Sequence, residues 1–174
     1  MKKKIILFLL LALSILTACS NDKNEVKDSP LYEGKKLIIG VVGKTPKVRE
    51  QNIVFKSIEI KDLRQENLSS KYNAVFIMKE YLSEVAKALY AKIYKNSSIP
   101  FFFIESKKSY VPFVDEETDY EEFPDTKSGD YAAGYYHDGE NGTYWGYGLY
   151  NNTVNEVNIL DVYSRIFNTI GNQK

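Results

Sequence analysis

The sequence contains very few of the residues that most often bind metals or form covalent intermediates. Among its 174 residues there are one cysteine, one histidine and one tryptophan. A single cysteine excludes an internal disulfide, and a single histidine excludes a metal site built from several histidines. The patterns H-E-x-x-H, G-x-S-x-G and C-x-x-C are absent as well. We therefore expect a protein that is not an enzyme and that holds no metal and no cofactor.

An excess of positive charge is also missing, and apolar runs are short. The 23 Lys+Arg residues balance the 23 Asp+Glu residues, and a chain that begins at Cys19 lacks three of the lysines. Without a basic patch, nucleic acid is not an expected partner. The apolar stretch within residues 5–18 would reach about 21 Å as a helix, against a hydrocarbon core of roughly 30 Å. We therefore expect no permanent transmembrane helix.

The first nineteen residues have the three parts of a secretory signal. Three lysines at positions 2–4 precede the apolar stretch, and small residues follow at Thr17 and Ala18. The segment Leu16-Thr17-Ala18-Cys19 resembles the lipobox of bacterial lipoproteins. This resemblance implies cleavage between Ala18 and Cys19 and a diacylglyceryl group on the Cys19 sulfur. An ordinary signal peptide with a chance cysteine is the alternative.

Lipidation would also account for the lone cysteine, because an unmodified exposed thiol is reactive outside the cell. Two acyl chains anchor a protein stably, where one chain binds only marginally. The stretches KSYVPFVDE and YWGYGLYN add to the resemblance, which is to small lipoproteins of Bacillus-type Gram-positive bacteria. That group implies no particular activity. It implies a domain anchored by lipid on the extracytoplasmic face of the cell membrane.

Composition divides the chain into a signal, a tether and one domain. Residues 1–18 are the predicted signal peptide. Residues 19–34 are polar and charged without apolar periodicity, which predicts a flexible tether, with an ordered N-terminal strand as the alternative. Residues 35–174 show no internal repeat and no second change of composition, and they are long enough for one hydrophobic core.

Buried strands and amphipathic helices alternate along this domain. The alternation predicts an α/β fold with a three-layer Rossmann-like or flavodoxin-like sheet, mainly parallel, in the strand order 2-1-3-4. A β-hairpin insertion precedes the last helix. The expected strands are 36–42, 53–60, 74–78 and 99–104. The expected helices are 63–70 with Asp62 as its cap, 80–95, and a last helix that runs from a Thr153–Glu156 capping box to Gly171. The expected hairpin spans 131–150 and turns at 138–142.

Gly43-Lys44-Thr45 follows the first predicted strand and resembles the end of a phosphate-binding loop. The complete pattern G-x-x-x-x-G-K-[ST] requires a glycine at position 38, where this chain has Ile38. The polar residues after Pro46 do not have the pattern of the long helix that should follow. We therefore expect a strand end and a turn, with Pro46 placed to open a short helix, and no nucleotide site.

The same loop belongs to a set of polar strand ends. In open α/β sheets, ligands bind beyond the carboxyl ends of the strands, near the point where the strand order reverses. Side chains of both charge signs follow three of the predicted strands and suit a small polar ligand. Solvated loop ends are the alternative. The candidate ligand-binding residues are Lys44, Thr45, Lys79, Glu80 and Glu105.

Residues 115–125, DEETDYEEFPD, contain seven carboxylates. Calcium prefers clustered oxygen ligands, but the spacing does not match an EF-hand. A solvated acidic loop is the prediction, and calcium binding stays open.

Seven aromatic residues, interleaved with five glycines, crowd the predicted hairpin, residues 131–150. We expect most of these rings to pack on the sheet. Tyr144 and Trp145 are the candidates for stacking on a ring-shaped ligand such as a sugar, or for contacting an envelope protein. His137 is expected in the turn, exposed and not catalytic. A binding or accessory domain at the cell envelope is the leading expectation, and a hydrolase that uses only carboxylates remains the enzymatic alternative.

Overall fold

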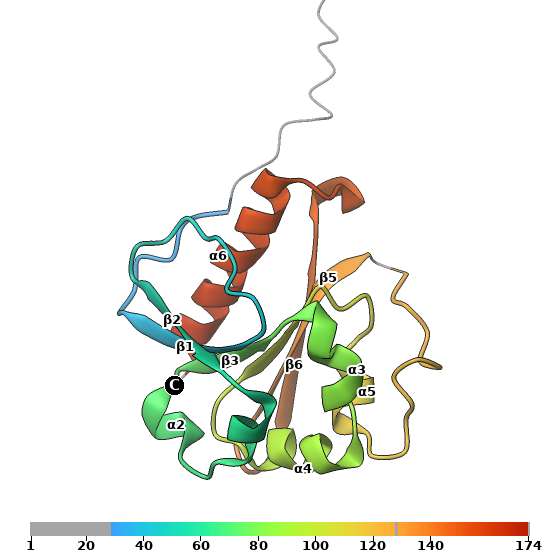
Figure 1. The fold of residues 1–174 in the computed structure, drawn as a ribbon. Helices are drawn as coiled ribbons and strands as arrows, with labels where there is room; N and C mark the ends of the chain where they lie inside the picture. The colour runs from blue at the N-terminus through green and yellow to red at the C-terminus, as the bar shows by residue number, and fades with distance from the viewer. Residues whose placement is uncertain (1–28, 128, 174) are drawn as a thin grey trace, which may run out of the picture.

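The computed structural model describes residues 29–127 and 129–173, which form a six-stranded sheet with helices on both faces (Figure 1). The predicted α/β class is therefore confirmed. The predicted signal peptide, the cleavage site at Ala18 and the lipidation site at Cys19 lie outside the described residues. Within the described part of the chain, no helix is both long enough and apolar enough to cross a membrane.

The first four strands are parallel and lie in the order β2-β1-β3-β4, as predicted. β1 (Leu37–Val42) pairs with β2 (Ile53–Ile58) on one side and with β3 (Ala74–Ile77) on the other, and β3 pairs with β4 (Phe101–Ile104). β3 and β4 are buried along their whole length and β1 almost entirely. Central strands of a parallel sheet are covered on both faces, which is why they are continuous apolar runs.

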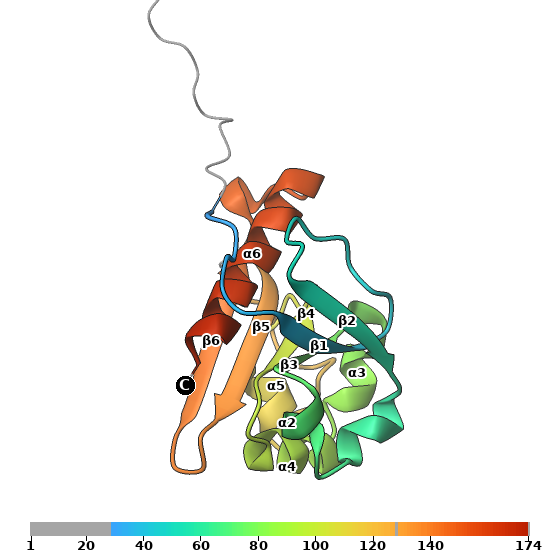
Figure 2. The same ribbon diagram turned by 90° about the vertical axis from the view of Figure 1, so that its left-hand side faces the viewer.

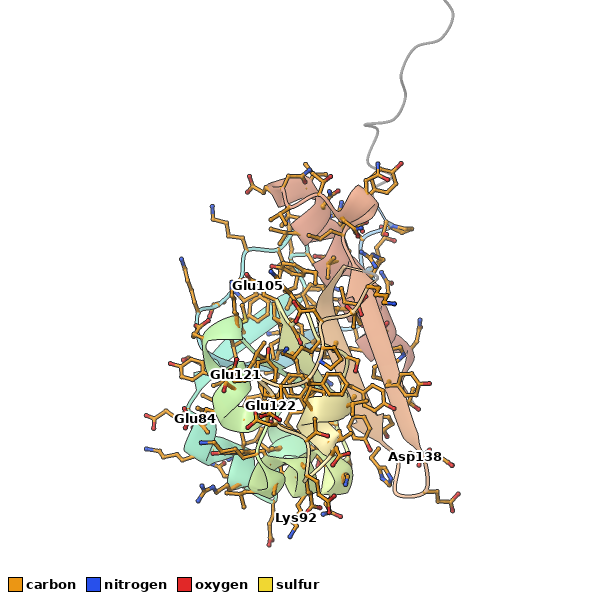
Figure 3. The ribbon with its side chains drawn as sticks, turned by 90° about the vertical axis from the view of Figure 1, so that its right-hand side faces the viewer. Glu84, Lys92, Glu105, Glu121, Glu122 and Asp138 are labelled. Carbon is orange, nitrogen blue, oxygen red and sulfur yellow. The ribbon has the colours of Figure 1, made fainter. Side chains whose placement is uncertain are left out.

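The predicted hairpin is confirmed and extends the sheet beyond β4. β5 (Asp130–His137) pairs antiparallel with β4 and with β6 (Gly142–Gly148). Figure 3 shows Asp138 at the tip of the hairpin. At Gly134, an added Cβ would lie 2.8 Å from the Phe102 ring and 2.9 Å from the Trp145 ring. Glycine at this position therefore lets the Phe102 and Trp145 rings stack on each other over β5.

One face of the sheet is covered by a single long helix, α6 (Glu156–Asn172) (Figure 2). Phe76 of β3 lies at the centre of this layer. Its ring stacks on Phe167 and Tyr163 of α6, with centroids 6.0 Å and 6.1 Å away. Each large aromatic side chain that is buried here contributes a few kcal/mol to stability, so the α6 layer is a main part of the core.

The opposite face is covered by several short helices and by its own aromatic cluster. Phe103 of β4 stacks on Phe113 with ring centroids 3.6 Å apart, and Phe101 packs on Tyr94 at 4.8 Å. The elements of this layer are η2 (Ile60–Arg64), α2 (Leu68–Lys71), η3 (Lys79–Tyr81), α3 (Leu82–Val85), α4 (Ala88–Asn96) and α5 (Val111–Val114).

The helix predicted over residues 80–95 is wrong as one element. The chain leaves the helical path after Val85 and re-enters it at Ala88. In one continuous helix, Val85 and Tyr90 would lie about 140° apart around the axis. The break lets both side chains be buried on the same layer, and the Tyr94 hydroxyl donates to the Val85 carbonyl at 3.1 Å.

The helix predicted over residues 63–70 is likewise replaced by two short turns, η2 and α2. Asp62 does not cap it, because Glu59 is the N-cap of η2 and donates its backbone N–H to the Asp62 carboxylate at 2.8 Å. Leu63 and Leu68 are five residues apart and both are buried. One straight helix would again turn one of them away from the sheet.

The N-cap of the last helix lies two residues after the predicted cap, Thr153. Asn155 is the N-cap of α6, and its side chain accepts a hydrogen bond from the Asn158 backbone N–H at 2.8 Å. The Thr153 hydroxyl instead donates to the Asn151 carbonyl at 3.3 Å. A preceding 3-10 turn, η4 (Tyr150–Asn152), directs the chain into this start.

The packed part of the chain extends to Ser29, six residues before the predicted domain boundary at residue 35. The Ser29 N–H donates to the Asp161 carboxylate of α6 at 2.6 Å, and the Tyr32 ring is buried in the core. Gly171, the predicted stop of α6, lies inside the helix instead. A Cβ there would be 2.3 Å from the Tyr32 ring, so this glycine makes room for the N-terminal segment.

Residues 43–52 connect β1 to β2 without a helix, so Pro46 does not open the predicted short one. The loop lies on the α6 side of the sheet. Val48 packs against the core of that layer, and the Arg49 guanidinium donates to the Ser164 hydroxyl of α6 at 2.7 Å.

Candidate functional site

A cavity of about 510 Å³ lies at the carboxyl ends of the parallel strands, beside the first turns of α6. Four of the five strand-end residues predicted to bind a ligand line it. They are Lys44 and Thr45 after β1, Glu80 after β3 and Glu105 after β4. The structure therefore brings together residues that are up to 61 positions apart in the sequence.

The cavity lies where the strand order reverses. The connection from β1 to β2 passes on the α6 side of the sheet, while η3, α3 and α4, between β3 and β4, pack on the other side. The chain therefore departs in opposite directions from the neighbouring ends of β1 and β3. Such a divergence leaves a crevice that neither connection covers, and ligands of open α/β sheets bind there.

Gly43 sets the position of the Lys44 loop in this crevice. Its φ is +109°, and an added Cβ would lie 2.7 Å from a carboxylate oxygen of Glu80 and 2.8 Å from the Met78 Cβ. The Lys44 N–H donates to the same Glu80 oxygen at 3.3 Å. Glycine is required here by the close approach of the loop to η3. In the described residues 44–52 no helix follows, so the GKT segment does not have the geometry of a phosphate-binding loop.

Glu105 has an unusual backbone conformation at the edge of the cavity. It follows β4 directly, its φ is +58°, and its side chain is exposed. A left-handed conformation in a residue other than glycine costs on the order of 1–3 kcal/mol, and such residues are frequent at ligand sites. The next residue, Ser106, is buried, and its hydroxyl donates to the Lys108 carbonyl at 2.9 Å, which holds the turn in place.

Two tyrosines form the inner wall of the cavity. The rings of Tyr131 (β5) and Tyr163 (α6) meet edge to face with centroids 6.5 Å apart, and their hydroxyls are hydrogen-bonded. Burial raises the pKa of Tyr131 to about 12, and the negative charge of Glu105 acts in the same direction. Burial also raises the pKa of Tyr163 far above its ordinary value. Both hydroxyls are therefore protonated at neutral pH, and because one of them donates to the other, the pair has one hydroxyl hydrogen left to donate to a ligand.

The sequence did not identify these two tyrosines as site residues. Tyr163 belongs to the apolar stripe of the last helix, and Tyr131 belongs to the aromatic hairpin, so local pattern predicts a packing role for both. The available signal was weak: Tyr163 is the one hydroxyl-bearing aromatic residue in that stripe.

A second cavity, of about 370 Å³, lies on the other side of Glu105 and Tyr131, which line both spaces. Lys79, the fifth predicted strand-end residue, does not line the larger cavity. It lines the second cavity, together with Val154. The predicted strand-end residues are thus divided between two neighbouring cavities, and Glu105 and Tyr131 line both of them.

Tyr144 and Trp145 lie away from the strand-end cavity. Tyr144 is 61% exposed and stacks on Tyr110 with ring centroids 4.4 Å apart, on the face of the short helices. Trp145 is half-buried on the opposite face and stacks on Phe102. Tyr135 is buried opposite Tyr144. The rings are divided between the two faces of the sheet, so they do not form one continuous contact surface.

The carboxylates of residues 115–125 have local partners. Asp119 accepts from the Glu121 N–H at 2.8 Å, and Asp125 lies 3.2 Å from the Lys108 ammonium. Figure 3 labels Glu121 and Glu122 on this side of the molecule. Across residues 29–127 and 129–173, no three His, Cys, Asp or Glu side chains are grouped as a metal ion would require.

His137 is at the start of the hairpin turn, remote from both cavities. Its Nδ1 accepts from the Gly139 N–H at 3.1 Å, which helps to close the turn. In Figure 3 the hairpin tip, marked by Asp138, and Glu105 lie far apart along the domain. His137 therefore contributes nothing to the strand-end site.

Fold and site together define a class: an α/β domain with a ligand-sized crevice at the reversal of its strand order. The chain matches no protein-family model, no curated protein and no solved structure. The function is therefore argued from the site itself.

Proposed function

We propose that the protein is an extracytoplasmic lipoprotein, anchored through Cys19, whose domain binds a small polar ligand in the strand-end cavity. One observation carries the binding function: a cavity of about 510 Å³ at the point where the strand order reverses. Ligand pockets typically have volumes of roughly 300–1,000 Å³. The lipobox-like segment from Leu16 to Cys19 supports the anchor.

The strand order supports a Rossmann-like or flavodoxin-like, three-layer assignment of the fold. Order β2-β1-β3-β4 with parallel pairing is that of a doubly wound sheet, in which the β1/β3 junction holds the ligand. Two features depart from the pattern. Residues 43–52 replace the first helix, and β5 and β6 continue the sheet antiparallel.

The chemistry of the cavity suits a compact zwitterion with an apolar body, such as an amino acid or a short peptide. Lys44 supplies a positive charge to the cavity, and Glu80 and Glu105 supply negative charges. Ile159 and Leu160 of α6 add an apolar surface to the same cavity. A ligand with both charges and a hydrophobic side chain would match all three surfaces.

Thermal unfolding of the unlipidated chain tests this function. A chain of residues 20–174 retains every described residue. The panel holds amino acids, short peptides, muropeptides, sugars, nucleotides and calcium. Ligand at about one hundred times its Kd stabilises the native state by about 2.7 kcal/mol. We expect a stabilising amino acid or peptide, whose effect is lost in Lys44→Ala and in Glu105→Gln.

The matched control is Glu140→Gln, which removes a carboxylate at the exposed hairpin turn and should leave binding unchanged. Full affinity in both cavity variants would remove the proposed site. Stabilisation by calcium alone would point instead to residues 115–125.

A carboxylate hydrolase is the second candidate, because Glu80, Glu105 and Glu156 all line the same cavity. Glycoside hydrolysis requires two carboxyl groups on either side of one bond, and it requires no histidine. Incubation with peptidoglycan fragments tests this alternative. Release of new reducing ends by the parent chain, and not by Glu105→Gln, would favour it over simple binding.

A further inference from the structure

Exposed apolar side chains are concentrated in one short segment of the domain. Tyr150, Val154 and Val157 are 40%, 75% and 46% exposed, and they fall within eight consecutive residues. Glu156 is the only charged residue from position 150 to 157. The segment comprises η4, the three residues that follow it and the first two residues of α6. We refer to residues 150–157 as the apolar end.

The apolar end has a fixed shape. Asn158, which is buried, donates from its side-chain amide to the Thr153 carbonyl at 2.6 Å and to the Tyr150 carbonyl at 3.2 Å. Asn151 and Asn152 adopt positive φ values of +49° and +53°. Such conformations are sterically costly outside glycine and persist only where the surroundings hold them. The exposed side chains are therefore presented by an ordered turn.

The chain enters the domain at this same end. The Ser29 N–H is bound to Asp161, one and a half turns into α6, at 2.6 Å. Figures 1 and 2 agree that the first described residues, in blue, begin beside the start of α6, while α4 lies at the opposite end of the molecule. Nine residues separate Cys19 from Ser29. Even fully extended, the ten steps between them span at most about 36 Å.

We infer that the apolar end, residues 150–157, rests on the lipid surface to which the protein is anchored. The inference depends on the lipid anchor of the proposed function. An anchor at Cys19 and an attachment at Ser29 keep this end nearer to the bilayer than the α4 end. Valine and tyrosine side chains with neutral asparagines around them suit the boundary between lipid headgroups and acyl chains.

A contact of three side chains is weak for a free protein but sufficient for a tethered one. The covalent link from Cys19 to Ser29 makes docking intramolecular, and short links of this kind give effective concentrations in the millimolar range. The contact is apolar in character, because Glu156 is its single charge. It therefore requires no anionic lipid. Val154 also lines the second cavity, and Asn155 and Glu156 line the strand-end cavity, so docking places this edge of both cavities beside the membrane.

Site-specific fluorescence on the full lipidated protein tests the contact. Cys19 is the only cysteine and is blocked by the lipid, so one introduced cysteine takes the label alone. The test variant is Val157→Cys, and the matched control is Leu89→Cys. Both residues lie in the first turn of a helix, and they are 46% and 48% exposed, but Leu89 belongs to α4 at the far end.

The labelled proteins are reconstituted into phosphatidylcholine vesicles that carry a quencher on the upper part of the acyl chain. We expect several-fold stronger quenching at position 157 than at position 89. A label at position 154 should behave like the one at 157. Equal, weak quenching at all three positions in vesicle-bound protein would overturn the docking while leaving the anchor intact.

Flotation of the same vesicles separates the two levels of the argument. The parent protein should float with the lipid, and Cys19→Ser should not. If the parent does not float, the anchor fails, and the docking inference fails with it. If the parent floats and only the labels at 154 and 157 are quenched, both the lipid anchor and the docking of the apolar end are supported. Quenching that appears only with added anionic lipid would contradict the apolar character of the contact.

Discussion

Gly43 and Gly139 have similar backbones and different surroundings. Their φ values are +109° and +101°, but nothing lies within 4 Å of a Cβ added at Gly139, whereas one added at Gly43 would meet Glu80 and Met78. Gly139→Ala should cost only the backbone strain, about 1–2 kcal/mol. Gly43→Ala adds overpacking, so we expect it to lose at least about 1 kcal/mol more.

Urea unfolding of both variants measures the difference directly. If the two glycine substitutions cost the same, the approach of the Lys44 loop to η3 is not as tight as the structure indicates. The ligand effect should also be weaker in Gly43→Ala, because the loop that carries Lys44 must move.

Tyr147 makes stability depend on alkaline pH. Burial raises its pKa to about 12, against the opposing hydrogen bond to Thr169 and the charge of Arg165, whereas an unfolded tyrosine titrates near about 10. Between these values the unfolded chain releases a proton that the folded chain keeps. The associated stability is therefore fully present below about pH 10 and is lost as the pH rises toward about 12.

Tyr147→Phe removes this contribution to the pH dependence. From about pH 8 to about pH 11, the variant should lose roughly 1 kcal/mol less unfolding free energy than the parent. Urea unfolding at the two pH values provides the measurement. The remaining alkaline loss in the variant is expected, because the pKa values of Tyr131 and Tyr163 are raised as well. Identical losses in parent and variant would show that Tyr147 is not buried as described.

At the scale of elements, the start of α6 separates sequence pattern from structure. The pattern predicts Thr153 as the cap, and the structure assigns that role to Asn155. Asn155→Ala should cost about 1 kcal/mol of unfolding free energy, the usual value for a lost N-cap. The unfolding free energy of Thr153→Ala should stay within about 0.5 kcal/mol of that of the parent, because Thr153 is exposed. Reversed values in chemical unfolding would restore the sequence prediction.

The elements predicted correctly are those with a signal contained in a few residues. The buried strands β1, β3 and β4 are short apolar runs, and the hairpin has glycine-containing turn residues between its strands. The helix over residues 80–95 was wrong because apolar spacing alone does not show whether Val85 and Tyr90 can both reach one sheet. That depends on where the sheet lies, which no local window contains.

At the scale of the whole molecule, the N-terminal segment is part of the fold. A chain cut at the predicted boundary, residues 35–174, loses the buried Tyr32 ring and the Ser29–Asp161 hydrogen bond. Removing a large buried aromatic side chain costs about 3–5 kcal/mol. We expect residues 35–174 to unfold at clearly lower urea than residues 20–174.

Leu31→Ala in the longer chain is the control for this truncation. Leu31 lies in the same segment but is exposed, so its loss should change stability by less than about 0.5 kcal/mol. Equal unfolding midpoints for the long and short chains would mean that residues 29–34 add nothing to the folded state. The domain boundary would then return to residue 35.

The candidate site was predictable in outline from the sequence. Lys44, Thr45, Glu80 and Glu105 were expected together because parallel strands end at one edge of a sheet. The pairing of Tyr131 with Tyr163 was not predictable, since it depends on how α6 lies against β5. The separation of Lys79 into its own cavity depends on the position of Glu105, whose left-handed backbone no residue pattern indicates.

The sequence by itself determined the kinds of elements, the parallel order of the first four strands and the polar strand ends. These follow from apolar runs, periodicity and chain connectivity, which are local or nearly local properties. Only the tertiary structure decided where helices break, which residue caps α6, and which tyrosines face the cavity. Those outcomes depend on contacts between residues far apart in the chain, because burial is settled by the whole core and not by any one segment.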